Sequence, residues 1–420
     1  MPYAVILSFE SFMSKRINRL NTKEFICIMA VLMSVTALSV DAMIPALGLM
    51  ATDLNVQNTN DIQMVIISIF FGMSFGIMFY GPFADSFGRK NSIYVGVAIF
   101  LIGTLVSIYA TNLETMLIGR TIQGFGGAAC RVVSLAIIRD KYEGVEMAKI
   151  MSLIMMVFIM VPALAPLLGQ GILILASWQA IFWFIFSFAL LGVTWMHFRQ
   201  RETLQAENRR AFSLSIILSG SIETIKNPVT LGYTIMTGVL FGSFIAYLSL
   251  AQQVMDVQYN LGNLFPMYFG ILAISYGTAS FVNAKLLAKF NVHKICFFFL
   301  TTHTIISLSS FILSVMLDGN LPFNLFYIYM LATFFCMGAL FGNFNSLALQ
   351  PWGHMAGIST SVITAIQIFL AVIVGGTIGQ LYNGTAQPLI ISFLVCGFVT
   401  LAIFIRIRTR SEESLLKKSP

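Results

Sequence analysis

Apolar residues run through this chain in long segments that short polar stretches separate. Each segment holds about 20 predominantly apolar residues, the length that a helix needs to cross the hydrocarbon core of a bilayer. The pattern therefore predicts an all-α integral membrane protein with 12 transmembrane helices. We expect these helices near residues 25–47, 62–83, 92–110, 113–138, 149–172, 178–198, 228–253, 262–284, 294–317, 323–347, 356–380 and 387–407.

The longest polar segment, residues 199–227, divides the predicted helices into two sets of six. Such a division is typical of internally duplicated secondary transporters, whose substrate path lies between the halves. We expect an N-terminal tail at 1–24, six-helix bundles at 25–198 and 228–407, a cytoplasmic linker at 199–227 and a C-terminal tail at 408–420.

Composition places the chain outside the range of soluble domains. Hydrophobic residues make up 58% of it and charged residues only 10%, whereas about a quarter of the residues in a soluble domain are charged. The five cysteines lie in apolar segments without metal-ligand spacing, so we expect packing and no metal site. No catalytic constellation or nucleotide-binding loop is visible, so the sequence does not predict an enzyme or any catalytic residue.

Positive charge is distributed unevenly between the two sets of connecting segments. If the N-terminus is cytoplasmic, 22 of the 24 Lys and Arg residues fall in cytoplasmic segments and the outer loops hold none. Lys and Arg are retained on the cytoplasmic side of a membrane, so both termini are predicted to be cytoplasmic. The net charge of +7 then reflects topology, and we expect a lipid bilayer and no nucleic acid as partner.

Three full charges lie deep inside the predicted helices: Asp41, Arg120 and Arg131. Each costs roughly 2.5–3.5 kcal/mol at the centre of a spanning helix on insertion scales, so each should face a partner or a wet cavity. Asp41 and Arg120 both lie about 10 Å from the outer surface, by the rise of an α-helix. We therefore expect them to form either a structural ion pair or a proton-coupling pair that protonation of Asp41 weakens.

Arg131 lies eleven residues after Arg120, a spacing that puts both side chains on one face of a helix. It either lines a cavity, where it is a candidate for substrate binding, or packs against another helix. Neutral polar residues within the helices either bind substrate or bond to a neighbouring helix, and three of them are candidates for substrate binding: Gln123, Asn345 and Gln367. His303 is either a proton relay or a hydrogen-bonded packing residue.

A charged turn at Gly81–Ile93 (GPFADSFGRKNSI) separates two of the apolar segments. It must lie at a membrane surface, because hydrocarbon cannot solvate Asp85, Arg89 and Lys90. A second basic turn at Asn283–Ile295 faintly echoes it in the second half, without an acid at the place of Asp85.

Pro162 and Pro166 interrupt the fifth predicted helix, and Gly169 follows them. Proline removes a backbone hydrogen bond and bends a helix, while glycine lets another helix approach closely. The segment is either a bend that gates the path between the halves or a static kink.

Several motifs resemble one transporter family. The turn at Gly81–Ile93 resembles the loop signature of the major facilitator superfamily, and Leu117–Ala129 (LIGRTIQGFGGAA) resembles its fourth-helix signature. Val161–Gln170 (VPALAPLLGQ) is similar to the fifth-helix signature of its antiporters, with Ala-Pro in place of Gly-Pro and Gly-Gln in place of Gly-Gly. Three further segments resemble drug-resistance transporters of the Bcr/CflA type: Asp41–Leu47, Cys130–Asp140 and Asn345–Gln367.

The resemblance implies a 12-helix drug:proton antiporter of a bacterial inner membrane that exports small molecules by alternating access. It implies that Asp41 takes up the proton and that Arg120 couples Asp41 to the fourth helix. The proton gradient would be the energy source, with no cofactor, and we expect a monomer.

The resemblance also implies that the charged turn latches the outward-open state of the transporter. Asp85 would lie near the N-terminal end of the eleventh helix, where the helix dipole favours a carboxylate, and a cationic neighbour such as Arg139 would assist it. The residues of this expected latch are Gly81, Asp85, Gly88, Arg89 and Arg139.

Two hypotheses about the cargo remain open. The chain exports several drugs or drug-like metabolites, or it exports one metabolite such as a siderophore or an amino-acid derivative. Arg120 and Arg131 against a single acid favour an anionic or neutral cargo over a simple cation.

Overall fold

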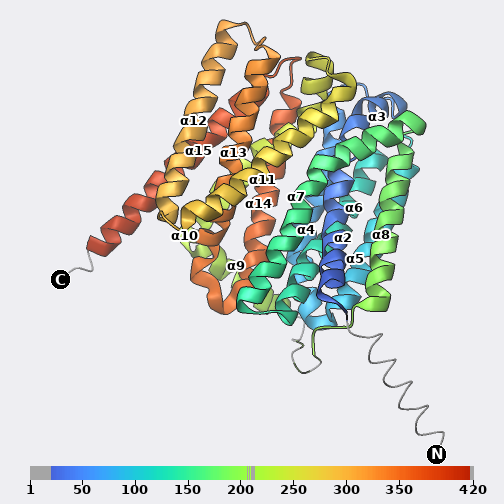
Figure 1. The fold of residues 1–420 in the computed structure, drawn as a ribbon, viewed down its shortest axis with the longest axis vertical. Helices are drawn as coiled ribbons and strands as arrows, with labels where there is room; N and C mark the ends of the chain where they lie inside the picture. The colour runs from blue at the N-terminus through green and yellow to red at the C-terminus, as the bar shows by residue number, and fades with distance from the viewer. Residues whose placement is uncertain (1–19, 206, 208, 210–212, 417–420) are drawn as a thin grey trace, which may run out of the picture.

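The computed structural model describes residues 20–205, 207, 209 and 213–416. Parts of the predicted tails, at 1–19 and 417–420, and linker residues 206, 208 and 210–212 lie outside the described residues. Figure 1 shows helices joined by short loops, and the described residues contain no strand. The all-α fold class predicted from the sequence is confirmed.

Twelve helices in the described part of the chain are long and apolar enough to cross a membrane, which confirms the predicted number. The first half contains α2 (Thr22–Asp41), α4 (Met64–Phe87), α5 (Arg89–Ile108), α6 (Leu113–Lys141), α7 (Gly144–Leu175) and α8 (Gln179–Arg199). The second half contains α10 (Pro228–Gln252), α11 (Phe265–Leu287), α12 (Val292–Met316), α13 (Phe323–Leu349), α14 (Ala356–Gln380) and α15 (Gln387–Leu416).

The two halves stand side by side, the first in blue to green and the second in yellow to red (Figure 1). Within the first half α6 packs against α4 and α5, and within the second α10 packs against α14 and α15. Across the halves α4 packs against α14 and α7 against α11. These four helices therefore form much of the wall between the halves.

The first span is broken just after Asp41. A short 3-10 turn at Ile44–Ala46 contains Pro45 and leads into the short helix α3 (Leu47–Asp53). Proline lacks the N–H that a continuing helix would need. The last carbonyls of α2 are therefore left without the partners that the next turn would have supplied.

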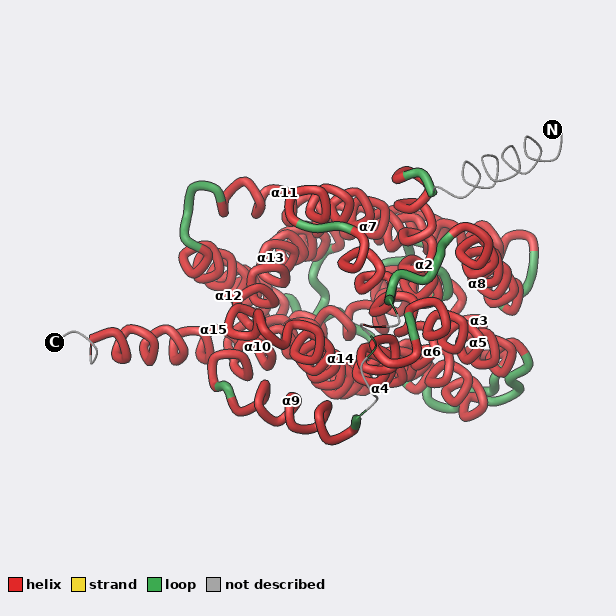
Figure 2. The backbone as a smooth tube through the Cα atoms, turned by 90° about the horizontal axis from the view of Figure 1, so that it is seen from below, coloured by secondary structure: helices red, strands yellow, loops and turns green. Residues whose placement is uncertain are grey.

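The segment predicted as a linker contains a further helix, α9 (Leu214–Lys226), which the sequence analysis did not foresee. Figure 2 shows it at the edge of the bundle, beside α10 and α14. Thr224 faces α14, where its hydroxyl lies 3.1 Å from that of Ser359, while Leu218 and Ile222 are exposed. The helix thus buries a small polar face and presents apolar side chains outward.

Successive long helices alternate in direction, so their connections gather at two ends of the bundle. One end carries Arg89, Lys141 and Arg199, where α5 begins and α6 and α8 finish; we call it the basic end. The opposite end carries Asn60 and Tyr382 and is called the far end.

Asparagine residues cap the starts of several helices. At the far end, Asn112 accepts the N–H of Thr115 at 2.9 Å, which satisfies a free donor of the first turn.

Candidate functional site

A cavity of about 300 Å³ lies between the two halves. Helices α2, α4, α6 and α7 line it from the first half, and α10, α11, α13 and α14 from the second. Most of its wall is aromatic or aliphatic, and its volume lies in the range of small-molecule sites. The aromatic members of the wall are Phe70, Phe158, Phe241, Phe244, Tyr247, Phe269, Tyr276, Phe334 and Phe341.

One acid and one base line this cavity among the described residues, Asp41 of α2 and Arg131 of α6. Asp41 is 4% exposed and is the last residue of its helix. Neither side chain forms a hydrogen bond or ion pair with a described residue. An unpaired buried charge costs several kcal/mol, so each of the two groups needs a partner from the cavity. Asp41 can take up a proton, and both groups can bind water or a ligand.

Arg120 does not pair with Asp41, contrary to the prediction. Its fully buried guanidinium donates to the carbonyl oxygens of Ser39 at 2.9 Å and Val65 at 3.2 Å, and to Gln123. The Ser39 carbonyl is free because α2 ends two residues later. Arg120 therefore ties α6 to the end of α2 through the backbone and not through the carboxylate.

Gln123 also lies away from the cavity, which corrects its prediction as a substrate-binding residue. Its amide donates to the Thr104 hydroxyl at 2.8 Å and its oxygen accepts from Arg120. The side chain is fully buried between α5 and α6. The sequence does not distinguish polar residues on the packing face of α6 from those on its cavity face. Only the hydrogen-bond partners in the structure separate the two.

Asn345 of α13 and Gln367 of α14, both predicted as substrate-binding candidates, do line the cavity. The Gln367 amide donates to Asn345 Oδ1 at 2.9 Å, and the Asn345 amide donates to the Phe341 carbonyl at 3.0 Å. These bonds hold two neutral polar groups at fixed positions in an otherwise apolar wall.

A second cavity of about 270 Å³ continues from the first toward the basic end. Four residues line both cavities: Arg131, Asn345, Thr364 and Gln367. Beyond them the wall includes Gly81, Asp85 and Arg139 and the first turns of α14. The turn at Gly81–Ile93 thus lies beside the N-terminal end of the eleventh span, as the sequence analysis expected.

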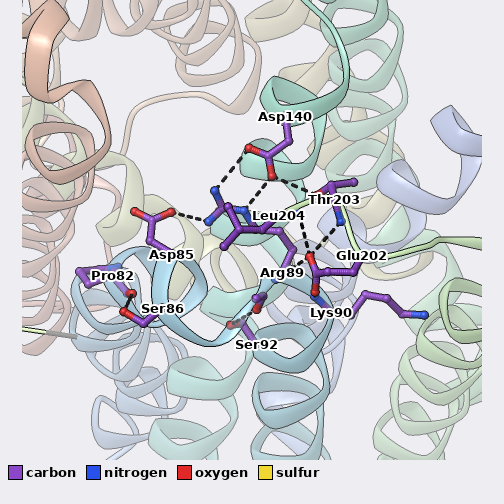
Figure 3. A network of polar contacts seen from close by, with 11 residues as sticks. Pro82, Asp85, Ser86, Arg89, Lys90, Ser92, Asp140, Glu202, Thr203 and Leu204 are labelled. Carbon is purple, nitrogen blue, oxygen red and sulfur yellow. Dashed lines mark hydrogen bonds and ion pairs between the residues drawn. The ribbon is translucent and has the colours of Figure 1, made fainter. Parts of the chain in front are cut away.

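Asp85 forms its ion pair with Arg89 and not with Arg139 (Figure 3). The Arg89 guanidinium contacts Asp85 at 2.5 Å and Asp140 at 2.9 Å, and the Thr203 hydroxyl donates to Asp140 at 3.0 Å. Arg89 lies four residues after Asp85, at the start of α5, whereas Arg139 of α6 lines the second cavity. The expected role of Arg139 beside Asp85 belongs to the outward-open state and stays a prediction.

Glu202, a linker residue that the sequence analysis passed over, sits on the start of α5 (Figure 3). Its carboxylate accepts the backbone N–H groups of Arg89 and Lys90, each at 3.0 Å. Gly88 permits this approach: its φ is 96°, and a Cβ there would lie 2.8 Å from the Glu202 carboxylate. The linker is therefore bound to the charged turn by a charge at a helix N-terminus.

The helix α7 stays continuous through Pro162 and Pro166. Pro162 lines the central cavity. Gly169 lies against α2, since a Cβ on it would lie 1.8 Å from the carbonyl oxygen of Ala42. The proline segment and its glycine thus contact the helix that carries Asp41, at the residue that follows it.

His303 of α12 lies outside the cavity lining. It is fully buried, and its Nε2 lies 3.3 Å from the carbonyl oxygen of Phe393 on α15. This environment supports the packing role of the two that the sequence left open.

The far end is closed by hydrogen bonds between the halves. Gln63 of the first half donates to Gln253 of the second at 2.6 Å, and Gln253 donates to the Thr59 carbonyl at 2.9 Å. The Asn60 amide donates to the Tyr382 carbonyl at 2.9 Å. The central cavity therefore continues toward the basic end and is bounded at the far end.

Comparison with known proteins supports the resemblance found in the motifs. A bicyclomycin resistance protein homolog of Haemophilus influenzae is 28% identical over 394 residues, covering 93% of this chain and 97% of that protein. Multidrug resistance protein MdtL of Klebsiella pneumoniae is 27% identical, covering 80% of this chain and 83% of its own length. These relatives confirm the predicted likeness to transporters of the Bcr/CflA type.

Solved structures agree in fold at low sequence identity. The inward-open xylose transporter XylE from E. coli matches with a TM-score of 0.71 at 14% identity, covering 92% of this chain and 95% of that one. The human organic anion transporter MFSD10 matches with a TM-score of 0.66 at 13% identity, covering 92% and 99%. A family model described as Major Facilitator Superfamily matches residues 29–376. This chain is a multi-pass membrane protein and belongs to the Major Facilitator Superfamily of transporters.

Proposed function

We propose that the protein exports small molecules, drugs or drug-like metabolites, across a bacterial inner membrane in exchange for protons. One observation carries this proposal: Asp41 is the only acid among the described residues that line the cavity between the halves. Relatives named for resistance to bicyclomycin and to multiple drugs support export as the direction. The protein would act as a monomer, with the proton gradient as its energy source and no cofactor.

Asp41 is suited to exchange a proton for a ligand. A carboxylate without a protein partner in a low-dielectric cavity is stabilised either by a proton or by a cationic or hydrogen-bonding ligand. The two then compete for one site, which is the requirement for antiport. Arg120 would sense this exchange through the end of α2, because it holds the Ser39 carbonyl two residues before Asp41.

Alternating access would come from rocking of the halves around this cavity. The hydrogen bonds at the far end would break as the basic end closes, with both termini on the cytoplasmic side. Gly81, Asp85, Gly88 and Arg89 would latch the closed basic end, since Gly81, Asp85 and Arg89 line the second cavity together with the first turns of α14. Arg139 lines the same cavity and would approach Asp85 in that state.

The experiment uses purified protein in liposomes with an imposed pH gradient and a lumenal pH dye. Unrelated drugs should each evoke proton movement, and Asp41→Asn should abolish it while the protein still folds and keeps some ligand binding. Asp318→Asn is the matched control, because Asp318 is an exposed loop residue whose φ of 51° asparagine also tolerates. Asp85→Asn should slow turnover without changing the order of substrates.

The outcomes separate the two cargo hypotheses. A response to one metabolite alone identifies a dedicated exporter. Substrate-driven proton movement that survives in Asp41→Asn removes Asp41 from coupling. Transport of drugs without any proton movement overturns antiport.

A further inference from the structure

One hydrogen bond sets the relative heights of Asp41 and Arg131. The Thr36 hydroxyl donates to the Gly127 carbonyl at 3.0 Å, so these residues share a level on α2 and α6. Asp41 lies five residues beyond Thr36 toward the far end, and Arg131 lies four residues beyond Gly127 toward the basic end. By the rise of an α-helix, their backbones are roughly 13 Å apart along the bundle.

The two side chains shorten this separation. Side chains tilt toward the N-terminus of their own helix. Since α2 and α6 run in opposite directions, Asp41 leans toward the basic end and Arg131 toward the far end. Their charges are therefore on the order of 10 Å apart along the length of the cavity.

Aromatic rings form the wall of the same cavity. The centroid of Phe241 lies 5.9 Å from that of Phe70 in the other half, and 5.7 Å from those of Phe244 and Phe341. A flat aromatic ligand can pack on such rings edge-on or offset. The neutral Asn345 and Gln367 adjoin Arg131 at the junction of the two cavities and add hydrogen-bonding capacity without charge.

The cavity holds one charge of each sign, because Arg120 is engaged elsewhere. The sequence favoured an anionic or neutral cargo because both Arg120 and Arg131 were expected to face the cargo. In the structure only Arg131 lines the cavity, so this argument no longer holds. A simple cation would pair with Asp41 and leave Arg131 unpaired. A simple anion would pair with Arg131 and leave Asp41 unpaired. A ligand that carries both charges satisfies both groups, and an unsatisfied buried charge is costly.

We propose that the cargo is an elongated zwitterion with an aromatic body, whose cation binds Asp41 and whose acidic group binds Arg131. This inference rests on the proposed function and names the substrate class of the same cavity. The spacing of the two protein charges selects ligands whose own charges lie at opposite ends of the molecule. Competition between the ligand cation and a proton for Asp41 agrees with antiport.

The test is equilibrium binding to the purified full chain in lipid nanodiscs by calorimetry, without any gradient. The long zwitterion is 4′-(aminomethyl)biphenyl-4-carboxylic acid. Its methyl ester keeps only the cation, its N-acetyl derivative keeps only the anion, and biphenylalanine keeps the aromatic body with both charges at one end. The long zwitterion should bind about tenfold more tightly than each of the other three, as expected for losing one charged hydrogen-bond pair.

Variants assign the two ends of the ligand. Arg131→Gln should weaken the long zwitterion about tenfold and leave the methyl ester unchanged, whereas Asp41→Asn should weaken the ester and leave the N-acetyl derivative unchanged. Arg131→Lys, which keeps the positive charge, should retain more affinity for the zwitterion than Arg131→Gln. If a variant fails to fold, the comparison of the four probes on the native chain still tests whether the cavity prefers a long zwitterion.

Three results would each overturn the whole inference, and two more follow them. The three are no binding of the long zwitterion, equal affinity for all four probes, and equal weakening of ester and zwitterion by Arg131→Gln. Tight binding by biphenylalanine would refute the spacing argument. The binding test uses no gradient, so it is independent of the liposome test of antiport. Charge-selective binding without proton movement in liposomes would refute antiport alone. Proton movement without charge-selective binding would refute the zwitterion alone.

Discussion

Gln63 and Gln253 join the two halves of the transporter at the far end through their side-chain amides, with Gln63 Nε2 donating to Gln253 Oε1 at 2.6 Å. They are 190 positions apart in the chain, and both are buried. Gln253 also binds the backbone of Thr59. The contact holds the cavity closed at this end, so its strength should set how readily the far end opens.

Gln63→Ala and Gln253→Ala should each favour opening of the far end. A neutral hydrogen bond contributes about 1 kcal/mol net, which corresponds to roughly a fivefold shift in a two-state equilibrium. Spin labels at the exposed loop residues Asn58 and Asn383 should report more of the longer distances in pulsed electron paramagnetic resonance. The exposed Cys27 is first replaced by serine in every sample.

Gln57→Ala is the matched control for this experiment. Gln57 lies in the same loop, but its amide reaches only the Asn55 carbonyl at 3.5 Å, so the distances should not change. The double variant Gln63→Ala/Gln253→Ala should shift the equilibrium no further than Gln253→Ala alone, because Gln253→Ala already removes the bond to Gln63 as well as the bond to the Thr59 carbonyl. Fully additive shifts would contradict a shared contact.

Gly169→Ala should destabilise the protein, and Gly171→Ala should not. The added methyl group at Gly169 would lie 1.8 Å from the Ala42 carbonyl, whereas at Gly171 it meets nothing within 4 Å. Overpacking costs about 1–3 kcal/mol, while alanine in a helix is about 1 kcal/mol more favourable than glycine. Thermal unfolding of the two purified variants measures the difference, and equal melting temperatures would show that α7 does not press on α2.

Gly169→Ala should also disturb Asp41, because Ala42 follows it directly. The ester probe, which carries only a cation, should lose affinity in Gly169→Ala and keep it in Gly171→Ala. Unaltered ester binding in a destabilised Gly169→Ala protein would limit this contact to packing.

Glu202→Ala should free the start of α5. The carboxylate caps the N–H groups of Arg89 and Lys90 at 3.0 Å, and loss of an N-terminal cap costs about 0.5–2 kcal/mol. Hydrogen exchange of a peptide that begins at Ala84 and contains the Arg89 and Lys90 amides should accelerate. Glu207→Ala removes an equal charge from an exposed position of the same linker and should leave exchange unchanged. Similar acceleration in both variants would mean that linker charge, and not the cap, protects α5.

Much of the architecture was predictable because it follows from the cost of placing groups in hydrocarbon. Apolar segments of spanning length are conspicuous, and so are Asp41 and Arg131 within them. The structure places both on the cavity, together with Asn345 and Gln367. A charge deep in an apolar segment needs a partner or a wet space, so its identity already signals a site.

The partners of these groups were not predictable in the same way. Position along a helix indicates depth, and Asp41 and Arg120 do lie near one depth, but depth does not say which acceptor lies closest. The acceptor for Arg120 is the Ser39 carbonyl, a backbone group that becomes free only because α2 ends at Asp41. Glu202 is one of several acids in a polar linker, and nothing in its neighbourhood in the sequence marks it as a cap.

The number of spans, the division into two halves, the family and the short set of deep charges could all be predicted from the sequence. These depend on local composition, since the cost of burying a residue in a membrane is a property of the residue and its segment. The tertiary structure alone decided that Arg131 faces the cavity while Arg120 and Gln123 join helices. That choice depends on where helices end and how the two halves meet, and both are properties of packing between segments far apart in the chain.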